Sequence, residues 1–198
     1  MKPGFIMLYW LLVAYFLCGI GSIFASFILN NLLGGSSAIF THGKSKVSIK
    51  DEPEATKFLA QFTVPKRWFW HFYALGSVAS LFSLYLNRTI PSLLLLLQCV
   101  RRLVESFTIM PGGKGSEMHL IHSLICMTYY PVLLVSFSFA DSRSSIICVT
   151  LFLVASVLQS YSHYLLGRQR RASSKHSPIN HPLFRFIHAP HYFAEFLI

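Results

Sequence analysis

Apolar residues in this 198-residue chain are gathered into five long runs, which are separated by polar and mostly basic segments. The runs cover residues 5–33, 68–86, 91–110, 118–139 and 144–166. Each is close to or above the roughly 18 residues with which a helix crosses a bilayer. A shorter apolar segment covers residues 190–198. The pattern predicts an all-α, multi-pass membrane helix bundle with about five full spans and the start of a sixth.

The composition supports a membrane protein and gives no reason to divide the chain. Hydrophobic residues make up 54% of it and charged residues only 12%, a balance too apolar for a soluble domain of this length. We therefore expect a single membrane domain over residues 1–198. The first run, within residues 1–40, is longer than the apolar core of a signal peptide and has no clean cleavage site after it, so we expect a retained helix.

The net charge of +10 is unevenly distributed. If the five spans are right, segments 34–67, 111–117 and 167–187 lie on one side of the membrane and carry most of the lysines and arginines. Because basic loops stay in the cytosol, this side is expected to be cytosolic and the N-terminus lumenal or external. The basic side either sets the topology and attracts anionic headgroups, or also binds a phosphate-rich ligand. Nucleic acid is not expected as a partner, because the cations are divided between loops without a soluble fold to carry them.

The cysteines Cys18, Cys99, Cys126 and Cys148 lie inside apolar runs and form no CxxC pair. We interpret them as small buried hydrophobic residues and expect no disulfide framework.

The third run carries charges that hydrocarbon disfavours. Arg101, Arg102 and Glu105 interrupt it, and an unpaired charge inside a span costs roughly 3 kcal/mol. Arg101 and Glu105 are four residues apart, so they share a helical face and can neutralise one another. They form either a structural ion pair near the helix end or a polar contact to a ligand in the bundle.

Histidines occur at the ends of the runs. The spacings His119-x-x-His122 and His188-x-x-His191 suit a pair of metal ligands, but no cysteine or second carboxylate accompanies them. No metal site is predicted, and these histidines are interpreted as hydrogen-bond donors near the interface.

Two regions concentrate polar and aromatic residues beside apolar runs. Residues 64–73 place cations and polar-tipped aromatics at the mouth of the second run, as either an interfacial belt or the edge of a site. Residues 159–171 are expected to form the end of a helix that carries three arginines. We call Arg168, Arg170 and Arg171 the basic collar. Arginines beside a loop can hold phosphates by bidentate contacts.

Five short motifs follow one another between residues 41 and 198. They are His42-Gly43-Lys44-Ser45-Lys46, Val64-Pro65-Lys66-x-x-Phe69-x-His71-Phe72-Tyr73, Arg101-Arg102-Leu103-x-Glu105, Gln159-x-x-x-His163 and Pro190-His191-Tyr192-x-x-Glu195. In order and spacing they resemble the polyprenol reductases of the steroid 5α-reductase family. The second motif is specific to the polyprenol branch. The last is shared with steroid reductases and, more loosely, with isoprenylcysteine methyltransferases.

The resemblance implies an NADPH-dependent, multi-pass oxidoreductase of the endoplasmic reticulum membrane. Such an enzyme saturates the α-isoprene unit of a polyprenol-type lipid, polyprenol or polyprenal, on the route to dolichol for protein N-glycosylation. The implied partners are a long-chain isoprenoid lipid and the membrane, and no protein partner is inferred. By position, the resemblance places these residues against NADPH: Arg101, Gln159, His163, Arg170, His191 and Glu195. Gln98 and Glu105 fall at neighbouring cavity positions where steroid reductases have tyrosines.

The chemistry of hydride transfer indicates the acceptor. Hydride needs a carbon made electron-poor by conjugation, so we expect an α,β-unsaturated aldehyde instead of the free allylic alcohol. A polar donor near the carbonyl would stabilise the developing enolate. The candidate catalytic residues are Tyr73, Glu105 in its protonated form, and His191. Tyr73 is alternatively an interfacial anchor.

Two other functions compete with the reductase. The family's usual final helices do not follow Ile198 in this sequence, so the chain is alternatively a truncated, non-catalytic membrane relative that binds lipid or a partner. A methyltransferase that uses S-adenosylmethionine rests on the Pro-x-Tyr-x-x-Glu element alone.

Overall fold

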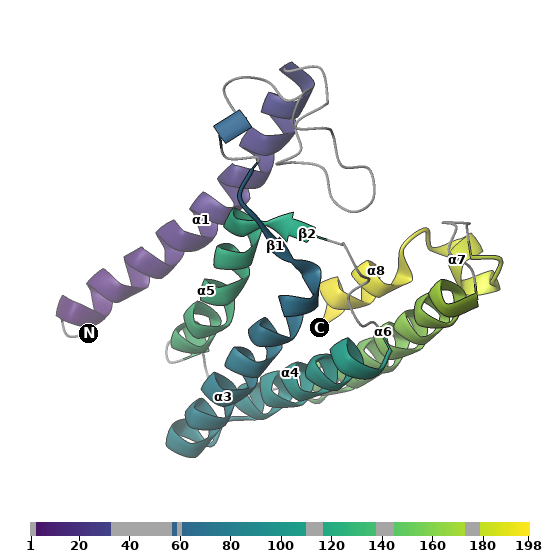
Figure 1. The fold of residues 1–198 in the computed structure, drawn as a ribbon. Helices are drawn as coiled ribbons and strands as arrows, with labels where there is room; N and C mark the ends of the chain where they lie inside the picture. Colours follow the sequence, from purple (N-terminus) through teal and green to yellow (C-terminus); the bar gives the residue numbers. More distant parts are fainter. Residues whose placement is uncertain (1–2, 33–56, 59–60, 110–116, 138–144, 173–178) are drawn as a thin grey trace. The chain divides into compact units, whose positions relative to one another are not determined.

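The computed structural model describes residues 3–32, 57–58, 61–109, 117–137, 145–172 and 179–198. This part of the chain is mostly helical (Figure 1) and divides into two compact units. The first unit contains α1 (Pro3–Leu32), β1 (Thr63–Pro65), β2 (Glu117–His119) and α5 (Leu120–Phe137). The second contains α3 (Trp70–Asn87), α4 (Ile90–Thr108), α6 (Ile146–Ala172), α7 (Pro182–Phe186) and α8 (Pro190–Leu197). The short 3-10 helix η2 (Lys66–Phe69) lies where the units meet along the chain.

All five apolar runs contain a helix, as expected, and the segment from Pro190 forms α8. Two helices in the described residues are long and apolar enough to cross a membrane, Lys66–Asn87 and Ile146–Ala172, while Ile6–Gly19 and His122–Phe137 are shorter apolar stretches. The helix α4 has the length of a span but carries Arg101, Arg102 and Glu105, more charge than hydrocarbon accepts without pairing. The number of spans stays a prediction.

A small sheet was not predicted by the all-α interpretation. Strands β1 and β2 pair antiparallel, with Thr63 opposite His119 and Pro65 opposite Glu117. The Thr63 hydroxyl also donates to a Glu117 carboxylate oxygen at 2.8 Å. Three-residue strands have no alternation long enough to be recognised in sequence, which explains why the pattern showed only helices.

The prediction of buried cysteines is right for Cys99, which has an exposed fraction of 0%. It is wrong for Cys18 and Cys148, which are exposed on α1 and α6, and Cys126 is partly exposed. An apolar run does not state which face of its helix points outward, and a thiol is compatible with either face.

The helices α3 and α4 form an antiparallel hairpin joined by only two residues. Arg88 ends α3 in the left-handed conformation, with φ of 49°, and donates its backbone N–H to the Leu84 carbonyl at 2.9 Å. Thr89 caps α4 by accepting from the backbone N–H of Ser92 at 3.4 Å, and Pro91 occupies the first turn, where it loses no hydrogen bond. This connection brings the start of α3 beside the end of α4.

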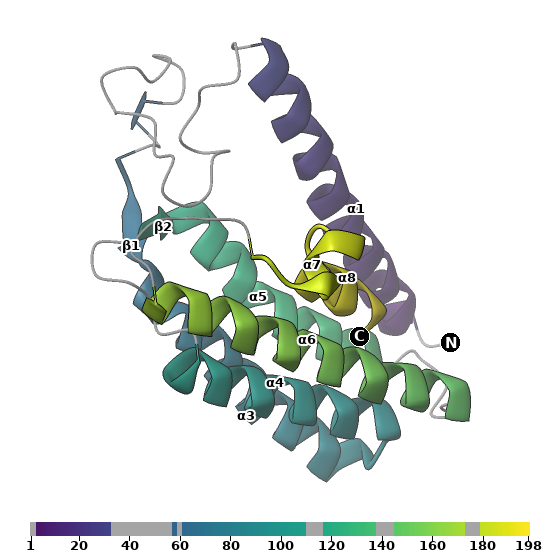
Figure 2. The same cartoon turned by 90° about the vertical axis from the view of Figure 1, so that its right-hand side faces the viewer.

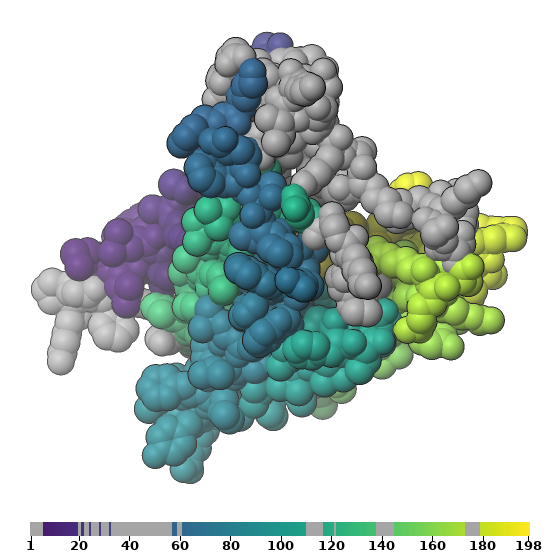
Figure 3. All heavy atoms as spheres, viewed as in Figure 1, coloured from purple at the N-terminus to yellow at the C-terminus, as the bar shows by residue number. Residues whose placement is uncertain are grey.

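In the second unit, α4 lies between α3 and α6, and α8 packs on α6 (Figure 2). The end of α4 approaches α6 closely at Gly167, where an added Cβ would lie 2.6 Å from the Ile109 carbonyl oxygen. Only glycine permits this approach. The helix α3 lies at the surface of the space-filling view (Figure 3), and several of its apolar side chains are exposed, among them Val78, Leu81 and Phe82. Such a surface suits contact with lipid.

Candidate functional site

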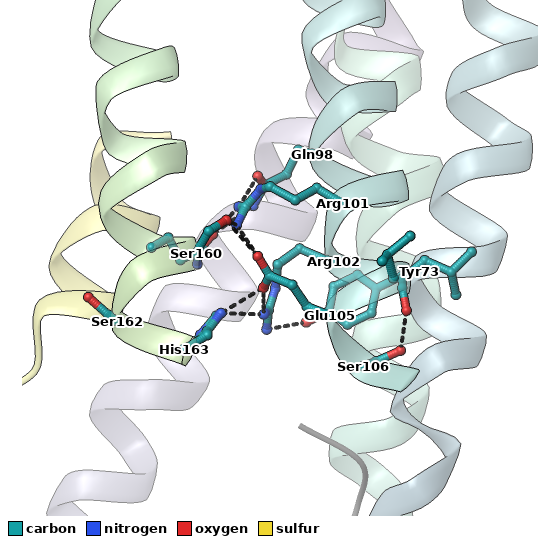
Figure 4. A network of polar contacts seen from close by, with 12 residues as sticks. Tyr73, Gln98, Arg101, Arg102, Glu105, Ser106, Ser160, Ser162 and His163 are labelled. Carbon is teal, nitrogen blue, oxygen red and sulfur yellow. Dashed lines mark hydrogen bonds and ion pairs between the residues drawn. The ribbon is translucent and has the colours of Figure 1, made fainter. Parts of the chain in front are cut away.

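The carboxylate of Glu105, on α4, is the centre of a buried polar network in the second unit (Figure 4). Its Oε1 accepts from Arg101 Nη1 at 2.7 Å and from the Ser160 hydroxyl at 2.7 Å. Its Oε2 accepts from Arg102 Nη1 at 2.8 Å and lies 2.7 Å from Nδ1 of His163. Glu105 is only 4% exposed. A buried carboxylate with this many donors is held in its ionised form.

Helical spacing explains how two helices supply all these groups. Arg101 and Arg102 precede Glu105 by four and three residues and form ion pairs with it. Ser160 precedes His163 by three residues on α6, so both project from one face of that helix. Of the two interpretations given for Arg101 and Glu105, the structure shows the ion pair, at 2.7 Å. The pairing is part of a larger network, which contains two arginines for one carboxylate.

The Nδ1 atom of His163 lies between a carboxylate and a guanidinium, 2.7 Å from Glu105 Oε2 and 2.8 Å from Arg102 Nη1. A carboxylate only accepts and a guanidinium only donates, so Nδ1 carries a proton when it bonds to Glu105 and a lone pair when it bonds to Arg102. Arg102 Nη1 donates to the same carboxylate oxygen at 2.8 Å, so the three groups are held together in either tautomer.

Tyr73, from α3, joins the network through Arg102. Arg102 Nη2 donates to the Tyr73 phenol oxygen at 2.8 Å, and the guanidinium carbon lies 5.0 Å from the centre of the Tyr73 ring. The hydrogen bond uses a lone pair of the phenol oxygen and not its proton. Arg102 therefore links the phenol to the Glu105 carboxylate.

A pair of buried amides continues the network along α4 and α6. Gln98 Nε2 donates to Gln159 Oε1 at 3.3 Å, and Arg101 Nη2 donates to Gln98 Oε1 at 2.6 Å and also to Gln159 Oε1. Gln159 has an exposed fraction of 0%, and its Nε2 has no hydrogen-bond partner among the described residues. We call the following residues the charged network: Tyr73, Gln98, Arg101, Arg102, Glu105, Gln159, Ser160 and His163.

His191, at the start of α8, borders this network. Its ring centre lies 5.7 Å from that of His163, and its buried Nδ1 has no hydrogen-bond partner within the described residues. Arg170 is exposed near the end of α6, two turns beyond His163, and interacts electrostatically with His191. Glu195 is exposed on α8. A polar ligand bound next to His191 would therefore have the Arg170 cation nearby.

The structure thus brings together five of the predicted site residues, with His191 next to them and Arg170 and Glu195 at exposed positions. The five are Tyr73, Arg101, Glu105, Gln159 and His163. Sequence reasoning gave no role to Arg102 or Ser160. Helical spacing was the available signal, since each lies three residues before a predicted site residue on its own helix.

The polar block at residues 64–73 has more than one role. Tyr73 reaches the charged network, whereas Trp70 stacks on His71 with ring centres 3.8 Å apart. Trp68 is 46% exposed, as a residue of an interfacial belt would be. The motif at residues 42–46 lies outside the described residues.

Within the described ranges, no group of three or more His, Cys, Asp or Glu side chains is placed to hold a metal ion. The rings of His119 and His122 are 6.3 Å apart in the first unit.

Comparison with known proteins gives two relatives. The chain is 31% identical to a polyprenal reductase of Saccharomyces cerevisiae over 147 residues, which cover 71% of this chain and 56% of the relative. It is 28% identical to an uncharacterised protein of Schizosaccharomyces pombe over 186 residues, which cover 79% of this chain and 65% of that protein. The chain therefore spans less than two thirds of each relative. No family model matches the chain, and no solved structure matches it.

These similarities support a relationship to reductases of the polyprenol type. The mostly helical fold, with helices apolar enough to cross a membrane, agrees with that relationship.

Proposed function

We propose that this chain is an NADPH-dependent oxidoreductase that reduces the α-isoprene double bond of a polyprenol-type lipid. The observation that carries the proposal is the similarity to a polyprenal reductase over most of the chain. The buried charged network supports it, because this network gathers the groups that such a reduction requires. The reaction is a step of dolichol synthesis for N-glycosylation, in the endoplasmic reticulum membrane with the basic loops in the cytosol.

The side chains present suit the cofactor. NADPH carries phosphates and a carboxamide, and it supplies hydride to an electron-poor carbon. The exposed cation Arg170 can bind phosphate, and the unpartnered Nδ1 of His191 can serve a neutral polar group. Glu105 orients Arg101 and His163, and the His163 ring centre lies 5.7 Å from that of His191. Glu195, exposed on α8, remains a predicted cofactor contact.

Tyr73 is the preferred proton donor. Hydride addition to an α,β-unsaturated aldehyde leaves negative charge on the carbonyl oxygen, and a phenol O–H can stabilise that charge or transfer its proton there. Arg102 donates to the phenol oxygen at 2.8 Å, so it stabilises the charge that develops as the proton leaves. Tyr73 is thus both oriented and activated by its neighbour.

Glu105 does not fit the role of protonated donor. Two guanidinium groups, a serine hydroxyl and His163 surround its oxygens and favour the carboxylate, which accepts hydrogen bonds and has no proton to give. We assign Glu105 to positioning: it fixes Arg101, Arg102 and His163. Without Glu105 as a donor, His191 becomes the second candidate donor after Tyr73.

The aldehyde is the proposed acceptor, in agreement with the substrate that the relative's name gives. The test supplies the full chain in lipid nanodiscs with NADPH and either polyprenal or polyprenol. The expected result is a saturated product from polyprenal alone. Reduction of polyprenol with no aldehyde intermediate would contradict the choice of acceptor, and no reduction of either lipid would contradict the proposed activity.

A further inference from the structure

Two buried polar groups lie at the end of the charged network furthest from the basic collar. They are the amide nitrogen Nε2 of Gln159 and the hydroxyl Oγ of Ser156, and neither has a hydrogen-bond partner in the described part of the chain. Leaving a buried donor unpaired costs about 1–3 kcal/mol. Folded proteins rarely keep such groups without a ligand or water to serve them.

The contacts of Gln159 determine where its amino group points. Its Oε1 accepts from Gln98 Nε2 at 3.3 Å and also from Arg101. With the oxygen held by two donors, the amide cannot flip without losing both bonds. The NH2 group is therefore directed away from Gln98 and Arg101, with its hydrogens available.

Ser156 shares the face of α6 that points to α4. It precedes Gln159 by three residues and Ser160 by four, and both of these contact α4. A serine inside a helix commonly donates to the carbonyl one turn earlier, as Ser162 does to Leu158 at 2.7 Å. Ser156 does not. Two unpaired donors thus lie on successive turns of one helical face.

These donors lie where the polar face ends and an apolar one begins. Contacts between α4 and α6 proceed in parallel along both helices, from Gln98 with Gln159 to Glu105 with His163. Before Gln98, α4 contains only leucines over residues 93–97, and before Ser156, α6 is apolar over residues 151–155. A ligand with a small polar head and a long apolar tail fits this boundary.

The charges nearby favour an uncharged head. Arg101 forms an ion pair with Glu105 at 2.7 Å, and its Nη2 already donates to Gln98 and Gln159. The collar cation Arg168 is twelve residues from Ser156, about 18 Å along a helix. A phosphate would find its counter-charges at the collar and not here. Both unpaired groups can donate, so the ligand atom they suit is an oxygen acceptor.

We propose that Ser156 and Gln159 bind the uncharged oxygen of a polyisoprenoid head, an aldehyde or an alcohol, at a position distinct from the one beside Tyr73 where the acceptor reacts, with the apolar tail beside the leucines of α4. The identity of the lipid rests on the proposed function. The assignment moves Gln159 from the cofactor to the lipid, and it gives Ser156 a role that its sequence context did not indicate.

The experiment measures equilibrium binding to the full chain in nanodiscs. The probes are tritiated polyprenal, polyprenol and a hydrocarbon of the same isoprenoid length that lacks the oxygen. The wild type should bind the two oxygenated lipids about threefold to tenfold more tightly than the hydrocarbon. The ratio of the dissociation constants for polyprenal and polyprenol then shows whether the site prefers an aldehyde oxygen or an alcohol oxygen.

Ser156→Ala and Gln159→Met should remove this advantage and leave hydrocarbon binding unchanged. Ser156→Ala removes an unpaired hydroxyl, so it should not impair folding, and Ser156→Thr should retain the advantage because it keeps the hydroxyl. Ser162→Ala is the matched control on the same helix, since its hydroxyl already has a partner.

Equal binding of all three lipids by the wild type, or no binding, would overturn the proposed oxygen site. The proposed site would also be overturned if Ser156→Ala lowered the affinity for NADPH and left the affinity for the oxygenated lipids unchanged. Turnover is measured separately: an oxygen preference without turnover contradicts the proposed activity alone, and turnover without the preference contradicts the oxygen site alone.

Discussion

The α3–α4 hairpin carries a polar cluster at each end, and the two clusters differ in kind. At the turn, a hydroxyl cluster of Ser83, Asn87, Thr89 and Ser92 is uncharged and internally paired: Ser83 and Ser92 are 2.8 Å apart, and Thr89 and Ser92 2.9 Å. At the opposite end, the charged network places two arginines against one carboxylate, and buried nitrogens of Gln159 and of both arginines have no partner among the residues that the structure describes.

The difference separates a structural polar cluster from a functional one. Donors and acceptors that satisfy one another hold helices together and have nothing left for a ligand. Buried donors without partners are costly unless a ligand or water serves them. The same helices therefore use polar residues for connection at one end and, in our proposal, for binding and chemistry at the other.

Removing the carboxylate should have the largest effect on stability. Glu105→Leu leaves Arg101 and Arg102 partly buried without a counter-ion, so we expect a loss of about 3 kcal/mol or more in the free energy of unfolding. Thermal unfolding of the purified chain in detergent measures this. The control is Glu195→Leu, which removes an exposed carboxylate. Equal melting temperatures of the two variants would contradict the central role of Glu105.

Removing the Tyr73 hydroxyl should affect catalysis and not folding. We expect Tyr73→Phe to lower kcat for polyprenal by about 100-fold, because general acid catalysis typically contributes that much, with NADPH affinity nearly unchanged. Tyr85→Phe is the control on the same helix, at a tyrosine that is 76% exposed. Full turnover by Tyr73→Phe would return Tyr73 to the role of interfacial anchor.

Arg170→Ala should weaken cofactor binding by about tenfold, the effect of losing one hydrogen bond to a charged group. If Arg170 contacts the 2′-phosphate, the variant should also lose part of its preference for NADPH over NADH. Fluorescence titration with both nucleotides measures this, and Arg185→Ala tests a cation whose Nη2 already donates to Asn180 at 2.7 Å. Titrations of wild type and Arg170→Ala that superimpose would refute the contact.

The smallest effect is expected in the hydroxyl cluster. Ser92→Ala breaks the links to Ser83 and Thr89 and should cost about 1 kcal/mol of stability, with NADPH affinity and turnover unaltered. The matched control is Thr150→Ala. In the described part of the chain, the Thr150 hydroxyl donates to the backbone carbonyl of Ile146, within its own helix. A change in turnover with Ser92→Ala would show that the two ends are coupled.

The sequence alone determined the five long helices and the shared helical face of Arg101 and Glu105. Long apolar runs predicted all five long helices, because the length of an apolar run is a local property that needs no knowledge of neighbours. The spacing of Arg101 and Glu105 predicted their ion pair for the same reason, since four residues always bring two side chains to one helical face.

Only the tertiary structure decided which helices meet. No local pattern states that α6 lies against α4, so the shared use of Glu105 by both helices was not available from the sequence. Helical spacing could mark Arg102 and Ser160 only as neighbours of predicted site residues. The approach at Gly167 and the outward position of Cys148 are likewise properties of packing. The unpaired state of Ser156 and Gln159 follows from the same cause: whether a buried donor has a partner depends on what lies across from it in space.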